Sequence, residues 1–244
     1  MRAHVLSVPF ENLDVQLGVP ITTRPEDAYA KIVERGRGGW CFEQNGLFKW
    51  ALTQIGFKVH SLAGYVGRVE TQPSKDANHL FLQVDCNETM FVDVGFGGSL
   101  LEPIPLRPCL IEHPPYSHSI NWVDGTFCRW TEQAHGAAST VDFTLVPVGS
   151  DFFDRTSQWL QTDPNSPFVR TLTAQRRYDN RHVVLRGLVK RTIDADGIND
   201  IELKSPEQLV MCLRDEFELN MPEIIECWDK LIAQHEERNR KKQS

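Results

Sequence analysis

The sequence predicts an α+β protein with three consecutive regions: a helical region over residues 1–57, a strand-rich region over 58–160 and a mixed region over 161–244. In the first region apolar residues recur every three or four positions, which is the period of an amphipathic helix. In the second region short alternating apolar runs are separated by glycine, proline and asparagine, as in antiparallel sheets. The turn-forming stretch 163–167 then opens the third region. A chain of 244 residues is long enough for two or three packed modules.

Two helices are expected in the first region. Residues Thr23–Glu26 have the form of a capping box, and Pro25 suits the first turn of the helix that follows. The second helix is expected to begin at Cys41, because apolar residues then recur at spacings of one, three and four until Gly56 ends the pattern. We expect this helix to be amphipathic and buried along one side.

The middle region is expected to form an antiparallel sheet or a small barrel. Its strand-like runs are residues 59–66, 79–84, 90–94, 127–130 and 141–148. The third region has a further strand-like run, 181–190, which precedes two helices. Ser205 and Gln208 have the spacing of a capping box at the start of the first of these helices.

Composition and charge exclude several function classes. The formal net charge is −7, from 33 acidic and 26 basic residues, so the chain lacks the basic excess of a nucleic-acid-binding protein. No apolar stretch reaches the ~18 residues of a membrane helix, and no signal-peptide pattern occurs. The six cysteines are scattered without a C-x-x-C spacing, which predicts neither a disulfide framework nor a metal site. We therefore expect a cytoplasmic protein without a metal, whose partners are neither nucleic acids nor membranes.

Cys41 is the cysteine whose surroundings favour reactivity. It follows Gly38, Gly39 and Trp40 and opens the second predicted helix. A thiol on the first turn of a helix faces unsatisfied N–H groups and the positive end of the helix dipole, which favour the thiolate. A nucleophilic cysteine also needs a base and a group that orients the base.

His79 and Asp93 are candidates for these two roles. They lie seven residues on either side of Cys86, in strand-like runs that flank a turn rich in aspartate and asparagine. A hairpin centred on Cys86 would make them direct cross-strand neighbours on one face, where a carboxylate can fix the tautomer of the imidazole. A slip of one residue would separate them, and the alternative is a half-buried polar pair without a catalytic role. The glycine-rich segment 95–98 that follows would let a ligand approach the backbone, although it has no phosphate-binding pattern.

Four segments taken together resemble the arylamine N-acetyltransferase family. They are Val8–Leu13, with the letters VPFENL, the RGGWCFEQN segment Arg37–Asn45, the strand residue His79, and the VDVGFG segment Val92–Gly97. They occur in the order and at the intervals typical of the family. A weaker resemblance continues through Asn165–Phe168 to the C-terminal helices, so it covers essentially the whole chain.

The resemblance implies a catalytic triad of Cys41, His79 and Asp93. Cys41 would take the acetyl group from acetyl-CoA and pass it to an arylamine or arylhydrazine in a ping-pong reaction. The resemblance further implies that Phe10 and Phe96 line the acceptor pocket.

It also implies that the loop containing Gly97 and Gly98 lies near the thiol end of CoA. Arg37 and Glu11 correspond to an ion pair that supports the Cys41 loop in the family. The family fold is a helical bundle, an antiparallel β-barrel and an α/β lid around a core like that of cysteine proteases. Because family members usually carry a further helical segment before the VPFEN residues, we expect the bundle to be shortened at its start.

Two other functions are compatible with these residues. The chain order Cys, His, Asp also suits a cysteine hydrolase or a transglutaminase-like enzyme with a papain-like site. The third possibility is an inactive relative that has lost the complete fold, against which the presence of all three triad residues argues.

Overall fold

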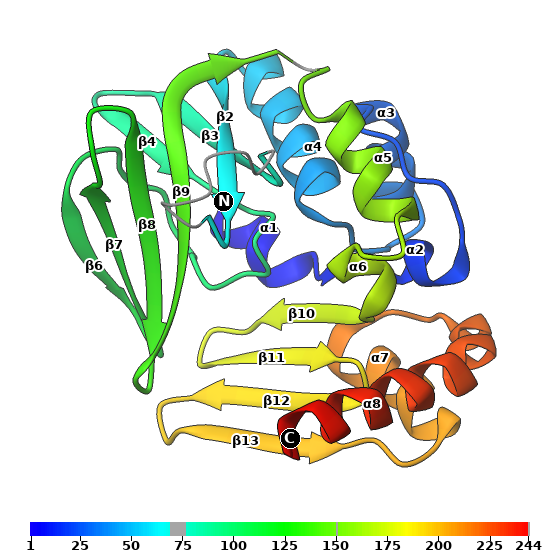
Figure 1. Cartoon of the computed structure of the whole chain (residues 1–244). Coiled ribbons are helices and arrows are strands. Elements are labelled where there is room, and N and C mark those ends of the chain that lie inside the picture. The colour runs from blue at the N-terminus through cyan, green and yellow to red at the C-terminus, as the bar shows by residue number, and fades with distance from the viewer. Residues whose placement is uncertain (69–76, 150, 244) are drawn as a thin grey trace.

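The computed structural model describes residues 1–68, 77–149 and 151–243, and it has three regions arranged around one centre (Figure 1). A curved eight-stranded antiparallel sheet that forms a nearly closed barrel lies beside a group of helices. A five-stranded antiparallel sheet with two helices packed on it lies below both. The mixed α/β architecture predicted from the sequence is therefore confirmed.

The first 57 residues form short helices and one short strand. Their elements are α1 (Arg2–Ser7), β1 (Phe10–Glu11), α2 (Leu13–Leu17), α3 (Pro25–Tyr29), the π-helical turn η1 (Ala30–Glu34) and α4 (Cys41–Gln54). Both predicted helices are present, with Pro25 at the first position of α3 and Cys41 at the first position of α4. The predicted capping box is wrong: Arg24 is the N-cap residue without a side-chain cap bond, and the Thr23 hydroxyl instead donates to Asp154.

Burial along α4 also differs from the prediction. We expected one buried side along its length, but residues 41–45 are buried on all sides while Trp50 and Ile55 are exposed. The start of the helix packs with Phe10 of β1 and with Leu80 of the barrel, whereas Trp50 near its end is exposed; Figure 1 shows α4 beside the barrel. Polar side chains of the first turns are thus enclosed and need partners within the protein.

The barrel strands contain four of the five strand-like runs of the middle region completely, and the fifth, 90–94, only up to Val92, so Asp93 follows the strand. They are β2 (Lys58–Val66), β3 (His79–Asp85), β4 (Thr89–Val92), β5 (Ile104–Pro105), β6 (Cys109–His113), β7 (Tyr116–Trp122), β8 (Phe127–Ala134) and β9 (Ala137–Val148). Their order across the sheet is β5-β4-β3-β2-β9-β8-β7-β6. Apolar residues on the concave face, among them Phe81, Phe91, Trp130 and Phe143, form a buried aromatic core that fills the barrel.

The register of the β3–β4 hairpin corrects one prediction. The hairpin pairs Asp85 with Thr89 and Leu82 with Val92, so its centre is Asn87 and not Cys86. His79 and Asp93 are therefore not direct cross-strand partners, because Asp93 lies opposite Phe81 when this register is continued. Moving the centre by one residue changes each partner by two positions, which leaves His79 and Asp93 on the same face as diagonal neighbours.

The third region contains more strands than the sequence indicated. The helix α5 (Asp154–Thr162) crosses the predicted boundary at 160, and it is followed by α6 (Pro167–Arg170), β10 (Thr173–Arg177), β11 (Arg181–Arg186), β12 (Val189–Asp194), β13 (Ile198–Glu202), α7 (Pro206–Phe217), the 3-10 helix η2 (Pro222–Cys227) and α8 (Trp228–Gln243). The predicted single run 181–190 is two antiparallel strands, because Gly187 adopts a positive φ of 62° and reverses the chain. The predicted cap of α7 is confirmed, since the Ser205 hydroxyl accepts a hydrogen bond from the Gln208 N–H at 3.3 Å.

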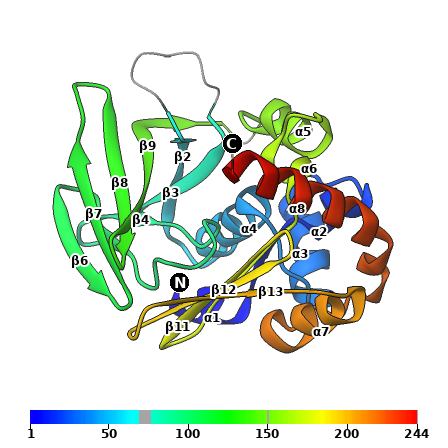
Figure 2. The same cartoon turned by 60° about the horizontal axis from the view of Figure 1, so that its bottom comes forward.

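The five-stranded sheet joins the first and third regions of the chain. Its order is β1-β10-β11-β12-β13, so the strand formed by Phe10 and Glu11 pairs with β10, more than 160 residues later. Helices α7 and α8 pack on this sheet through a shared apolar core (Figure 2). Among the residues that the structure describes, no helix is long and apolar enough to span a membrane.

Candidate active site

Close backbone packing fixes Cys41 at the start of α4. The preceding Gly39 forms a bridge with Phe10 of β1, and its N–H donates to the Pro9 carbonyl at 3.2 Å. A side chain at Gly95 could not be accommodated, because its Cβ would lie 2.7 Å from the Cα of Cys41. The glycines around Cys41 therefore allow β1, α4 and the loop after β4 to meet at one point.

His79 and Asp93 form a hydrogen-bonded pair next to this point. The Nε2 atom of His79 lies 2.8 Å from Oδ2 of Asp93, and both side chains are buried. The imidazole also interacts with the Cys41 thiol. Burial alone would lower the pKa of His79, but the Asp93 carboxylate and the neighbouring Cys41 outweigh it and raise that pKa. The structure thus brings together the three side chains that the sequence pointed to.

Asn45 connects α4 to the Asp93 loop, and the sequence did not indicate this role. One turn after Cys41, its amide nitrogen donates to Oδ1 of Asp93 at 2.8 Å and to the Leu80 carbonyl at 2.7 Å. Its amide oxygen accepts from the N–H of Val94 at 2.9 Å. Oδ1 of Asp93 also accepts from the Gly95 N–H at 2.8 Å. Every one of these groups is buried, so the carboxylate is held in one orientation toward His79.

A cavity of about 360 Å³ opens beside the thiol. Phe10, Cys41, His79 and Phe96 all contribute to its wall. The Phe96 ring lies edge-on to the His79 ring at 5.1 Å and edge-on to Trp130 at 5.0 Å. Lining residues that the sequence did not indicate include Glu132, Phe168, Gln175, His182 and Arg186.

Glu132 and His182 bring polar groups to this cavity from the barrel and from the five-stranded sheet. Oε2 of Glu132 and Nε2 of His182 are buried and have no hydrogen-bond partner among the described residues. Burial raises the pKa of Glu132 to about 7 and lowers that of His182 to about 3. No sequence signal marks either residue, because both lie in ordinary strand patterns far from the cysteine.

Gly97 and Gly98 pack against β10 and not along the cavity wall. Both have positive φ angles, 111° and 97°. A Cβ atom on Gly97 would lie 2.5 Å from the side chain of Gln175, and one on Gly98 would lie 2.9 Å from Cβ of Arg177. The two glycines therefore let the loop after Asp93 contact the five-stranded sheet.

A cluster of buried charges supports the Cys41 loop from the other side. Arg37 contacts Glu11 at 2.7 Å and Asp14 at 2.9 Å, which includes the ion pair that the resemblance implied. Lys31, which the sequence did not indicate, contacts Asp14 at 2.7 Å and Glu43 at 3.1 Å. Glu43 in turn accepts a hydrogen bond from the Trp40 N–H at 3.0 Å, directly before Cys41. Four buried charged groups and the partly buried Arg37 thus fix the chain on either side of the cysteine.

The remaining cysteines have no comparable surroundings. All six are free, and burial raises the pKa of Cys128 and of Cys212 to about 11. Among the described residues no group of three or more histidine, cysteine, aspartate or glutamate side chains could hold a metal ion.

Comparisons with known proteins identify the family of the chain. A model of the N-acetyltransferase family matches residues 1–225. The arylamine N-acetyltransferase of Mycolicibacterium smegmatis is 32% identical over 235 residues, which cover 92% of this chain and 84% of that protein. The chain belongs to the arylamine N-acetyltransferase family. As an arylamine N-acetyltransferase family member it is an acyltransferase.

Solved structures of arylamine N-acetyltransferases share its fold. The Mycobacterium tuberculosis structure has a TM-score of 0.83 at 29% identity and covers 91% of this chain and 86% of its own. The Mycobacterium marinum arylamine N-acetyltransferase in complex with CoA has a TM-score of 0.85 at 28% identity and covers 96% of this chain and 89% of its own. Human arylamine N-acetyltransferase 1 is 27% identical over 275 residues, which cover 98% of this chain and 89% of the human protein.

Proposed function

We propose that this protein transfers an acetyl group from acetyl-CoA to the nitrogen of arylamines or arylhydrazines through an acetyl-Cys41 intermediate. The observation that carries the proposal is the contact of the buried His79–Asp93 pair with Cys41 at the wall of a cavity. Membership of the arylamine N-acetyltransferase family supports the choice of donor and acceptor. The protein would act in the cytoplasm on small molecules.

In the first half-reaction the Cys41 proton moves to His79. The resulting thiolate attacks the thioester carbonyl of acetyl-CoA, a new carbon–sulfur bond forms on Cys41, and the bond to the CoA sulfur breaks. CoA leaves with the proton that His79 held. A raised pKa of His79, caused by the Asp93 carboxylate, favours the imidazolium that stabilises the thiolate.

In the second half-reaction the acceptor amine attacks the acetyl carbon on Cys41. His79 takes a proton from the attacking nitrogen and returns it to the Cys41 sulfur as the acetyl group leaves. Because CoA departs before the amine arrives, the kinetics are ping-pong. The backbone N–H of Cys41 at the first position of α4 is an available donor for the negative charge on the carbonyl oxygen.

The two aromatic rings of the cavity suit a flat acceptor. Phe10 and Phe96 line the same cavity as the thiol, and we assign them to acceptor binding. The loop with Gly97 and Gly98 links this cavity to β10, and we assign it to the thiol end of CoA. Neither assignment requires a metal.

Release of free CoA tests the proposal. The protein is incubated with acetyl-CoA alone and with acetyl-CoA plus an arylhydrazine, and the CoA thiol is measured over time. We expect one CoA per protein molecule without the acceptor and continuous release with it. Continuous release without the acceptor would identify a hydrolase, and no release under either condition would contradict acyl transfer.

A further inference from the structure

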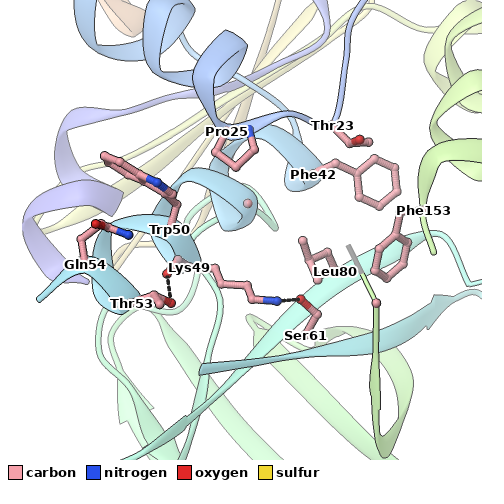
Figure 3. Close-up of a pocket in the computed structure, with 12 residues that line it drawn as sticks. Thr23, Pro25, Phe42, Lys49, Trp50, Thr53, Gln54, Ser61, Leu80 and Phe153 are labelled. Atoms are coloured by element: carbon pink, nitrogen blue, oxygen red, sulfur yellow. Dashed lines mark hydrogen bonds between the residues drawn. The ribbon is translucent and has the colours of Figure 1, made fainter. Parts of the chain in front are cut away.

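A second cavity lies on the opposite side of the catalytic elements. It has a volume of about 260 Å³, is open to solvent beside the exposed Trp50, and is lined by residues of α3, α4, β2, β3 and the segment that leads into α5 (Figure 3). Phe42 and Leu80 contribute to its wall, and they directly follow Cys41 and His79 in the sequence. Successive residues of a strand point to opposite faces, so Leu80 faces this cavity while His79 faces the thiol.

Most of the wall is apolar and aromatic. The rings of Phe42 and Phe153 lie 5.0 Å apart at one end, and the exposed Trp50 lies at the other end with Pro25 beside it (Figure 3). Benzene is held by apolar cavities of about 150 Å³, so this one has room for an aromatic ring with a short side arm.

Lys49 places a positive charge in this apolar wall. Its Nζ atom donates to the Ser61 hydroxyl at 2.9 Å, as Figure 3 shows. No carboxylate of the described residues lies within ion-pair distance of Lys49, whereas Lys31 of the same protein contacts three. Burial lowers the pKa of Lys49, and no acidic side chain offsets it. The half-buried ammonium therefore has no carboxylate counter-charge among the described residues, and its only side-chain partner among them is the Ser61 hydroxyl.

Ser61 adds a second polar group at the same place. Its hydroxyl oxygen accepts the hydrogen bond from Lys49, which leaves the hydroxyl proton free to donate to another acceptor. An ammonium and a hydroxyl side by side match the two oxygens of a carboxylate, and such charge-assisted bonds are stronger than those between neutral groups.

We propose that this cavity binds a small aromatic monocarboxylate, with its carboxylate on Lys49 and Ser61 and its ring between the Phe42–Phe153 pair and Trp50. The ligand would pack behind the first turn of α4 and the start of β3, away from the cavity that contains Cys41. The site is therefore independent of the acyl-transfer reaction and does not require it.

Calorimetric titration with two matched probes tests this site. Indole-3-acetate and indole-3-acetamide share ring and length and differ in the negative charge. We expect the acid to bind at least about tenfold more tightly than the amide, because only the acid forms the charge-assisted bond to Lys49. Equal affinities, or no detectable binding of the acid, would overturn the proposal without any mutant.

Three variants locate the binding. Lys49→Met should abolish the preference for the acid over the amide. Lys58→Met removes an equal charge from an exposed lysine of β2, and Arg186→Met removes a cation from the Cys41 cavity. Both controls should retain the preference. If Lys49→Met, shown by circular dichroism to be folded, still preferred the acid, or if Arg186→Met lost the preference, the acid would bind elsewhere.

Discussion

Two sets of buried charged side chains flank the first turn of α4, and they differ in what surrounds them. On one side, His79 and Asp93 adjoin the Cys41 thiol at the wall of a 360 Å³ cavity. On the other side, Lys31 and Arg37 are enclosed by carboxylates of Glu11, Asp14 and Glu43, none of which lines that cavity. Both sets contain ion pairs, and both show pKa values displaced by burial and neighbouring charge.

The difference teaches that buried charge alone does not mark an active site. Perturbed pKa values occur in structural ion-pair networks as well as in catalytic ones. What distinguishes the His79 side is a nucleophile and an open space where a substrate atom can be placed. We therefore expect changes on the two sides to have separate consequences, one for chemistry and one for folding.

Replacing Cys41 by alanine should separate the effect on chemistry from the effect on folding most strongly. We expect Cys41→Ala to lower the rate of arylhydrazine acetylation by more than about 10⁴-fold, because no nucleophile remains. The thermal midpoint should stay close to that of the unmodified protein, since alanine fits the buried position. Acetylation assays and calorimetry measure the two effects. The matched variant Cys86→Ala changes an exposed cysteine and should retain full activity.

Replacing Lys31 by methionine should have the opposite pattern and lower the stability of the fold. Loss of this cation leaves the carboxylates of Glu11, Asp14 and Glu43 without their shared partner, and breaking a buried ion pair costs about 3–5 kcal/mol. Urea unfolding measures this loss. Lys58→Met, which removes an exposed ion pair with Asp85, should cost less than about 1 kcal/mol. Equal costs for the two variants would mean that the buried cluster is not structural.

Asn45 belongs to the His79–Asp93 side and is itself buried and hydrogen-bonded, so its replacement should affect both catalysis and stability. Asn45→Ala removes the donor that holds Asp93 and the acceptor for the Val94 N–H. We expect kcat to fall about 100-fold with little change in KM, because His79 loses its fixed orientation. The free energy of unfolding should fall by about 1–3 kcal/mol through the unsatisfied buried groups. An unchanged kcat would show that Asp93 is held without Asn45.

Glu43 gives the charged cluster a dependence on pH. Burial raises the pKa of this carboxyl from 4.5 to about 7, against the opposing effect of Lys31. The folded state therefore binds the Glu43 proton more tightly than the unfolded chain does. The stability that this proton contributes is fully present below about pH 4.5 and is lost as the pH rises through about 7.

Glu43→Gln should remove this contribution, because the amide does not ionise. The stability of the variant minus that of the unmodified protein should therefore increase as the pH rises from about 5 to about 8, by on the order of 1 kcal/mol. Urea unfolding of both proteins at the two pH values measures the change. A stability difference that does not vary with pH would show that Glu43 is ionised throughout.

The chemistry-bearing residues could be predicted because they lie in local segments. A cysteine after paired glycines at a helix start, and a histidine and an aspartate beside one turn, are visible in short stretches of sequence. The hairpin centre was misplaced by one residue, yet His79 and Asp93 kept a common face because their partners changed by an even number of positions.

Groups that depend on distant contacts could not be predicted. In the sequence Lys31 has the pattern of an ordinary charged residue of a helix. Its burial is explained only by the three carboxylates that surround it in the folded protein. The pairing of Phe10 with Gln175 joins segments that local periodicity treats separately. Glu132 likewise reaches the cavity through the curvature of the barrel, which no pattern of strand residues encodes.

Intact-protein mass spectrometry after exposure to acetyl-CoA tests the central claim most directly. The protein is mixed with acetyl-CoA in the absence of an acceptor, and an arylhydrazine is then added. We predict the mass increase of one acetyl group, located on Cys41 by peptide mapping, which disappears when the arylhydrazine is added and never forms on Cys41→Ala. No adduct on the unmodified protein, or an adduct that persists on Cys41→Ala, would contradict the account.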